Sequence, residues 1–156
     1  MNKKILLIIT IVSSFLAISC GDKNTDPTIT PLTKEEVAKF QGTWGSDNLS
    51  KVSGDAVATE VMTASFTINA DGSIKDNDTQ QTITLDKINK VSDNVFQFTS
   101  KGAGGRTIIT LKHKVDFTDN NAPKDTLVWT REVFTTAENP AKSYSATYEG
   151  TLAKAQ

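Results

Sequence analysis

Residues 107–117 read TIITLKHKVDF and show the most regular alternation of apolar and polar side chains in this chain. The apolar side chains and the single histidine fall on one side of the segment: Ile109, Leu111, His113, Val115 and Phe117. Threonine, lysine and aspartate occupy the positions between them. Because successive side chains of a β-strand point to opposite faces, this period of two predicts a strand with one buried face.

The same alternation predicts further strands on both sides of this segment. They lie at residues 42–49, 58–68, around 74, 81–90, 94–100, 125–135 and 143–152. Turn-forming residues separate them, as in Asn69-Ala70-Asp71-Gly72 and in the glycine-rich stretch 101–106. About eight strands joined by short links predict an all-β, antiparallel up-and-down barrel, whose closure removes exposed strand edges. A two-sheet β-sandwich fits the same pattern and is the alternative.

A short helix is predicted directly before the first strand. Thr33 and Glu36 have the capping-box spacing, in which a hydroxyl and a carboxylate satisfy free backbone N–H groups at a helix start. Val37 and Phe40 supply a short apolar stripe, and Gly42 ends the segment. We therefore expect one helix over residues 34–40.

The first twenty residues form a separate segment. Lys3 and Lys4 precede an apolar run over residues 5–18, and Ser19 comes directly before Cys20. The run is too short for a membrane-spanning helix and has the flanks of a cleaved signal. It resembles a bacterial lipoprotein signal peptide, in which a small residue precedes the cysteine that carries the lipid. The resemblance implies removal of residues 1–19 and attachment of two or three acyl chains, such as palmitate, to Cys20.

This resemblance also predicts the location of the protein. Gly21 stands where inner-membrane lipoproteins of the enteric type have aspartate, so we expect a lipoprotein of the outer membrane, periplasmic or surface-exposed. Two buried acyl chains are enough for stable attachment to a membrane. Residues 20–32 are polar and contain prolines, which predicts a lipidated cysteine followed by a flexible tether. A plain secreted protein cleaved elsewhere in the same region is the alternative.

The remaining chain has the length of one domain, which we place at residues 33–156. Loss of Lys3 and Lys4 with the leader reduces the 17 basic side chains to 15, against 18 acidic ones. Such a mild charge gives no electrostatic reason to expect nucleic acid as a partner. Since the single cysteine is the predicted lipid site, we expect neither a disulfide nor a thiol nucleophile.

The segment Phe40-Gln41-Gly42-Thr43-Trp44 resembles the start of the lipocalin family and of its bacterial lipocalin-like relatives, where a short helix leads into a Gly-x-Trp strand. In that family the tryptophan closes one end of an eight-stranded barrel and packs under an arginine near the end of the chain. The resemblance assigns these structural roles to Trp44 and Arg131, although Arg131 lies one strand early. Asn120 replaces the tyrosine of the family's Thr-Asp-Tyr turn, and no helix follows the last strand.

A barrel of this kind would collect a set of mostly apolar side chains inside it. The candidate ligand-binding residues are Met62, Phe66, Phe96, Phe98, His113, Trp129, Tyr144 and Tyr148. An apolar wall with a few polar groups is typical of a small-molecule pocket. The interior of an eight-stranded barrel, however, can either be filled by side chains or hold one small ligand. These residues could therefore equally fill the barrel.

Other motifs that could carry chemistry are interpreted as structural. His113, the only histidine, has apolar neighbours on its strand and is expected to be a core histidine bonded to a neighbour. Asp76-Asn77-Asp78 lacks the glycine and final glutamate of a calcium loop and is read as a solvated turn. Glu60 and Glu132 are read as exposed rim carboxylates, and 102–105 as a hairpin rather than a phosphate-binding loop.

These observations predict a non-enzymatic, lipid-anchored envelope protein without cofactor or metal. Its expected activity is to bind a small hydrophobic or amphipathic ligand inside the barrel. The alternative is a surface-exposed interaction protein or antigen, whose filled barrel presents loops 101–106 and 119–125 to an envelope or host protein.

Overall fold

The computed structural model describes residues 32–135 and 140–155, which form a β-sheet domain with one short helix. The predicted signal peptide, Cys20 and nearly all of the tether lie outside these residues. Within the described part, no helix has both the length and the apolar character that a membrane span requires.

Ten strands make up one sheet, and neighbouring strands are antiparallel. In chain order the elements are α1 (Lys34–Ala38), β1 (Gly42–Gly54), β2 (Val61–Ile68), β3 (Ile74–Asp76), β4 (Thr82–Ile83), the 3₁₀ turn η1 (Leu85–Lys87), β5 (Asn89–Ser92), β6 (Val95–Gly104), β7 (Thr107–Asp116), β8 (Lys124–Phe134), β9 (Pro140–Thr151) and β10 (Ala153–Lys154). The spatial order is β4-β3-β2-β1-β9-β8-β7-β6-β5, and β10 also pairs with β1. The predicted all-β class with one short helix is therefore confirmed, whereas the two-sheet sandwich is wrong because all strands share one sheet.

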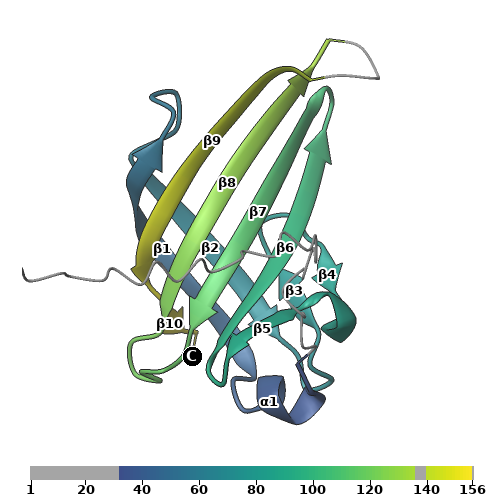
Figure 1. Cartoon of the computed structure of the whole chain (residues 1–156), viewed down its shortest axis with the longest axis vertical. Helices are drawn as coiled ribbons and strands as arrows, with labels where there is room; N and C mark the ends of the chain where they lie inside the picture. The colour runs from purple at the N-terminus through teal and green to yellow at the C-terminus, as the bar shows by residue number, and fades with distance from the viewer. Residues whose placement is uncertain (1–31, 136–139, 156) are drawn as a thin grey trace, which may run out of the picture.

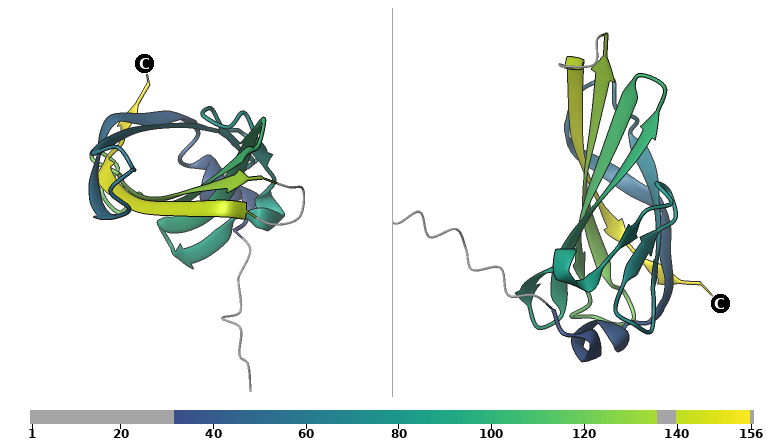
Figure 2. Two further views of the ribbon diagram at one scale, coloured as in Figure 1. Left: turned by 90° about the horizontal axis from the view of Figure 1, so that it is seen from above. Right: turned by 90° about the vertical axis from the view of Figure 1, so that its right-hand side faces the viewer.

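The sheet is strongly curved and forms a half-barrel. Strands β6–β9 make a long plate, β1 and β2 cross behind it, and α1 lies below (Figure 1). Seen from above, the sheet bends round from β9 through β1 to β2 (Figure 2). Two irregularities in β1 help this bend: the register shifts between Ser46 and Leu49 against β2, and between Lys51 and Ser53 against β9.

The end of β1 is a position that only glycine fills without strain. Gly54 has φ +116°, and a Cβ there would lie 2.3 Å from the Cα of Ala146 in β9. This close approach lets β9, the last long strand, pair with β1, the first.

The two edge strands, β4 and β5, share no backbone pairing among the described residues, so the sheet does not close through a continuous ladder. Side chains bridge part of the gap instead. The backbone N–H of Lys101 in β6 donates to Oε1 of Gln81, just before β4, at 2.6 Å. Ser100 in β6 likewise donates to Asp76 in β3. We call this junction between the β2–β4 side and the β6–β7 side of the sheet the seam.

The strand boundaries differ from the predicted ones mainly next to the seam. The strand predicted at 81–90 is wrong: it consists of the two-residue β4, the 3₁₀ turn and the start of β5. This break and the short β10 explain why the structure has ten strands where about eight were expected. The predicted alternation at 107–117 is confirmed, since Leu111, His113, Val115 and Phe117 are buried.

The helix closes the lower end of the domain, and its predicted capping box is confirmed. Thr33 N–H donates to Oε2 of Glu36 at 2.8 Å, and the Thr33 hydroxyl accepts from Glu36 N–H at 3.3 Å. Val37 is fully buried, and Phe40 stacks on Phe117 with ring centroids 4.2 Å apart. The helix spans five residues rather than the predicted seven, because Lys39 is already its C-terminal cap.

The buried apolar side chains form two clusters, one above the other in the half-barrel. The lower cluster is aromatic-rich and contains Phe40, Trp44, Phe66, Phe96, Phe98 and Phe117 together with aliphatic residues. The upper cluster contains Leu49, Ala58, Ala64, Leu111, Leu127, Ala146 and Tyr148, with Met62, Ile109 and Trp129 packed against it. Along β7, Val115 belongs to the lower cluster and Leu111 to the upper one, so His113 lies at the level between them.

Candidate functional site

A layer of buried polar side chains lies between the two apolar clusters. Its members come from four strands: Asp76 from β3, Ser100 from β6, His113 from β7 and Asp125 from β8. Each is at most 1% exposed. Burial of charged groups at this depth is costly unless they are paired, so their contacts decide what the layer can do.

His113 is held between two carboxylates. Its Nδ1 lies 2.7 Å from Oδ2 of Asp125, a hydrogen bond. Its Nε2 lies 3.4 Å from Oδ2 of Asp76, within ion-pair distance but without hydrogen-bond geometry. Asp76 also accepts a hydrogen bond from the Ser100 hydroxyl and from the backbone N–H groups of Asp78 and Thr79.

These contacts keep the imidazole charged. Burial lowers the pKa of His113, but the charge of Asp125 and the hydrogen bond to it, together with Asp76, outweigh burial and raise this pKa to about 9. Burial likewise raises the pKa of Asp76, but its contacts with His113 and Ser100 dominate and hold that pKa below its ordinary value. At neutral pH the layer therefore contains an imidazolium held between two carboxyl groups.

Ser100 and His113 are not arranged as a nucleophile and its base. The Ser100 hydroxyl donates to Asp76 and is not held by His113, as an activated nucleophile would be. The imidazole ring stacks on Phe98 at 4.6 Å and meets the edge of Phe66 at 5.7 Å, so aromatic rings cover it. No group of three or more metal-ligating side chains is found in residues 32–135 and 140–155. The expectation of a core histidine bonded to a neighbour is confirmed.

Two adjoining hollows open along the seam above this layer, and we call them together the seam groove. The first has a volume of about 230 Å³ and is lined by Met62, Thr63, Asp78, Thr79, Gly102, Ile109, Leu111 and Trp129. The second, of about 330 Å³, shares Asp78, Thr79, Gly102 and Ile109 with it and extends to Ala103, Gly104 and Thr107. Beside the groove, β6 and β7 rise beyond the ends of the short strands β3 and β4 (Figures 1 and 2).

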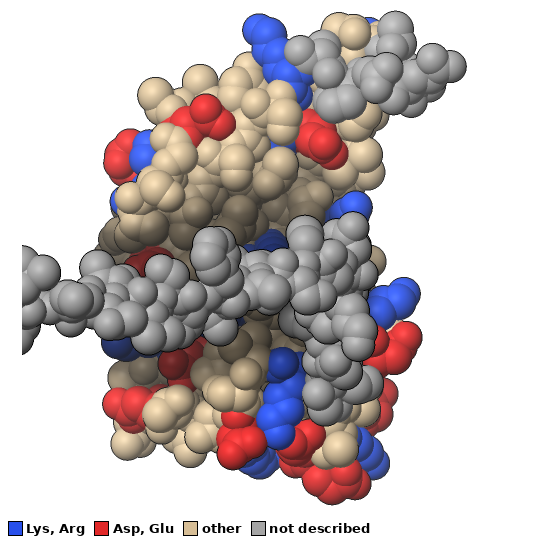
Figure 3. Space-filling view, viewed as in Figure 1, with Lys and Arg blue, Asp and Glu red and all other residues tan. Residues whose placement is uncertain are grey.

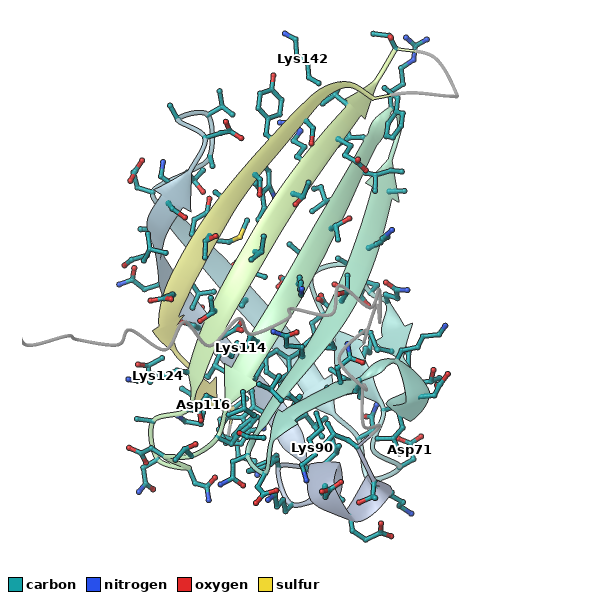
Figure 4. The ribbon with its side chains drawn as sticks, viewed as in Figure 1. Asp71, Lys90, Lys114, Asp116, Lys124 and Lys142 are labelled. Atoms are coloured by element: carbon teal, nitrogen blue, oxygen red, sulfur yellow. The ribbon has the colours of Figure 1, made fainter. Side chains whose placement is uncertain are left out.

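Two further hollows lie at opposite ends of β7 and β8. One of about 520 Å³ lies at the β6–β7 turn and runs along Phe134 and Thr135, next to residues outside the described part. Another, of about 380 Å³, lies where Lys114, Asp116 and Lys124 approach one another at the lower ends of β7 and β8 (Figure 4). Its lining is mostly polar and of both signs, and charges of both signs are also interspersed over the face shown in Figure 3.

The candidate ligand-binding residues lie in three different places. Met62 and Trp129 line the seam groove. Five others are at most 1% exposed and fill the interior instead: Phe66, Phe96, Phe98, His113 and Tyr148. Tyr144 is half-buried near the upper end of β9 and lines neither hollow of the groove. Most of the predicted pocket is thus packed core.

Trp44 is buried, but its cationic neighbour is Lys154 and not the predicted Arg131. Trp44 is 6% exposed in the lower cluster, and its Nε1–H donates to the carbonyl of Phe40 at 2.8 Å. The Nζ of Lys154 lies over its ring, 5.4 Å from the centroid, because β10 pairs with β1 at this position. Arg131 is exposed and pairs in register with Ile109 and Tyr144, in the upper half of the sheet.

Sequence reasoning missed the carboxylates of both sites. The sequence predicts a solvated turn at Asp76-Asn77-Asp78, whereas Asp76 is buried and Asp78 lines the groove. Strand alternation gives a signal for two other members of the buried layer. Ser100 follows Phe96 and Phe98 at every second position, and Asp125 lies two residues before Leu127. Comparison with known proteins gave no match to any family model, curated protein or solved structure.

Proposed function

We propose that this protein is a non-enzymatic, lipid-anchored protein of the bacterial outer membrane that binds a small hydrophobic or amphipathic ligand. The single observation that carries the binding proposal is the seam groove, where Met62, Ile109 and Trp129 expose apolar surface beside an otherwise packed interior. A concave apolar wall with few polar groups is the usual composition of a small-molecule site. The individual volumes, about 230 and 330 Å³, suit a small or slender ligand.

Binding in the groove is tested by filling it. A Cβ added at Gly102 would lie 3.5 Å from Cγ2 of Thr79, which is an ordinary van der Waals contact. Gly102→Leu therefore places a larger side chain in the groove without a clash between its Cβ and the backbone. Thr99→Leu adds the same side chain to the opposite, exposed face of β6 and serves as the matched control. We expect native mass spectrometry of protein from its own membrane to show an adduct on the wild type and on Thr99→Leu, but not on Gly102→Leu.

A second readout locates the ligand. Trp129 lines the groove and Trp44 is buried in the lower cluster, so a brominated aliphatic probe should quench the fluorescence of Trp129 and leave that of Trp44 unchanged. Trp129→Phe should abolish the quenching. A clean apo mass together with the absence of quenching would refute ligand binding.

The anchor is proposed from the sequence, since Cys20 lies outside the described residues. Replacement of Cys20 by serine should release the protein from the membrane fraction, and radiolabelled palmitate should be incorporated only in the wild type. Membrane separation should place the labelled protein in the outer membrane. Membrane retention of the Cys20→Ser protein would contradict the lipid anchor.

The lipocalin-like barrel is also retained as a proposal, and two features support it. Trp44 is buried in the lower cluster beneath a cation from the end of the chain, and the last strands pair with the first. The packed interior favours the second candidate function, in which the domain presents its loops to an envelope or host protein. Loss of partner capture on replacing loop 119–125, with no adduct on the wild type, would favour that candidate.

A further inference from the structure

The seam groove carries charge of one sign only. Among the residues that line its two hollows, Asp78 is the only one with a charged side chain. The other lining groups are aliphatic or aromatic side chains, threonines, small residues and backbone. An occupant of this groove therefore meets an apolar wall and a single carboxylate.

Asp78 is fixed in place but has no cationic partner in the part of the chain that the structure describes. Its Oδ2 accepts a hydrogen bond from the backbone N–H of Ser65 at 3.0 Å, and its own N–H donates to Asp76 at 2.9 Å. No lysine, arginine or histidine nitrogen of the described residues lies within 4.0 Å of its carboxylate. The side chain is also exposed, so a ligand can reach it.

In the surroundings of Asp78, two carboxylates outnumber one cation. The buried layer behind it holds the carboxylates of Asp76 and Asp125 around the single imidazolium of His113. Desolvation by neighbouring groups raises the pKa of Asp78 and the charge of Asp76 raises it further, against the hydrogen bond from the Ser65 N–H and the charge of His113. Both effects mark a carboxylate that would gain from a positive neighbour.

We propose that the seam groove selects amphipathic amines, with the ammonium group paired to Asp78 and the apolar body lying against Met62, Ile109 and Trp129. This inference rests on the proposed ligand-binding function and names the class of ligand. Charge complementarity supports it: an anionic head group would meet Asp78 at close range, and a neutral one would leave Asp78 without a charged partner. The ring of Trp129 is an apolar surface on which the methylene groups next to an ammonium can pack.

The test compares three probes with the same aliphatic chain, each brominated at its far end: a ten-carbon amine, the matching carboxylate and the matching alcohol. Quenching of Trp129 reports binding. The protein is the mature chain, residues 20–156, with Cys20→Ser, so that neither lipid nor detergent competes for the groove. Both apolar clusters are built within residues 32–152, which gives this chain its own core.

We expect the amine to bind at least about tenfold more tightly than the carboxylate, since a hydrogen bond between charged groups is worth a factor of this order. Asp78→Asn keeps an oxygen that can accept from Ser65 N–H and removes the charge. The Asp78→Asn variant should bind the amine about tenfold more weakly and the alcohol as tightly as the wild type does. Retained binding of the alcohol also shows that the variant is folded. Asp47→Asn, at an exposed position of β1 outside the groove, makes the same charge change and should alter nothing.

The outcomes separate this inference from the proposed function. If all three probes bind equally well, and Asp78→Asn changes none of them, the groove binds ligands but does not select amines. If no probe quenches Trp129 in any variant, ligand binding itself is refuted. If Asp78→Asn does not fold, the ratio of amine to carboxylate affinity in the wild type tests amine selection by itself, and equal affinities refute it.

Discussion

The charged imidazole of His113 makes a sharp prediction about pH. Because this is the only histidine of the chain, its ring gives a single set of imidazole signals in a proton NMR titration. We expect those signals to titrate with a midpoint near 9 in the folded protein, since Asp125 and Asp76 stabilise the imidazolium more than burial destabilises it. In urea, where these contacts are lost, the midpoint should return to about 6.5.

The size and sign of the stability effect follow from this shift. A pKa of about 9 against a model value of 6.5 corresponds to about 3 kcal/mol, at 1.36 kcal/mol per pH unit. Because the folded pKa of His113 is the higher one, the folded state binds the proton more tightly. The stabilisation is complete below pH 6.5 and is lost as pH rises through 9. The lowered pKa of Asp76 has the opposite sign, so its contribution is lost only in acid, as pH falls below the ordinary aspartate range.

The assay is urea unfolding of the mature Cys20→Ser chain at a series of pH values from 5 to 10. The free energy of unfolding should fall by about 3 kcal/mol between pH 6 and pH 10. Asp125→Asn removes the strongest cause that raises the pKa of His113, so the NMR midpoint should drop by more than a unit. Asp119→Asn, an exposed turn residue, should leave the midpoint where it is. A wild-type midpoint at or below 6.5 would refute the reasoning, because burial would then outweigh both carboxylates.

Two further predictions concern packing and backbone strain. Trp44→Phe removes the donor to the buried carbonyl of Phe40 and should lower the free energy of unfolding by about 2 kcal/mol; an unchanged urea midpoint would show that the bond contributes little. Gly54→Ala should cost at least about 2 kcal/mol, because its positive φ and the approach of Ala146 both oppose a side chain. Gly104→Ala is its control in thermal unfolding, since no atom lies within 4 Å of a Cβ there, and its effect should stay within about 0.5 kcal/mol. Equal losses in the two glycine variants would contradict this explanation.

Where the structure follows the sequence, the relevant interactions are local. The alternation at 107–117 places Leu111, His113 and Val115 inside because strand geometry alone sends every second side chain to the same face. The capping box of Thr33 and Glu36 forms because its two hydrogen bonds join residues three positions apart. Such signals can be read from a few neighbouring residues.

The sequence-based predictions are wrong where contacts between distant segments override the local pattern of side chains. The expected strand at 81–90 is interrupted by a 3₁₀ turn beside the seam, where the side chain of Gln81 accepts a hydrogen bond from the backbone of β6. Trp44 has Lys154 over its ring rather than Arg131, because the partner is set by the pairing of β10 with β1. Asp76 looked like part of a solvated turn, yet Ser100 and His113 draw it into the interior.

The amino-acid pattern alone is enough to specify an all-β domain, the inward face of its strands and the helix that caps it, since each depends on the periodicity of one segment. The curvature of the sheet, the buried carboxylates around His113 and the opening beside Asp78 emerge only once the chain is folded. Each of these depends on how far two strands remote in the sequence approach one another, and that distance follows from bulges, strand lengths and packing over the whole sheet.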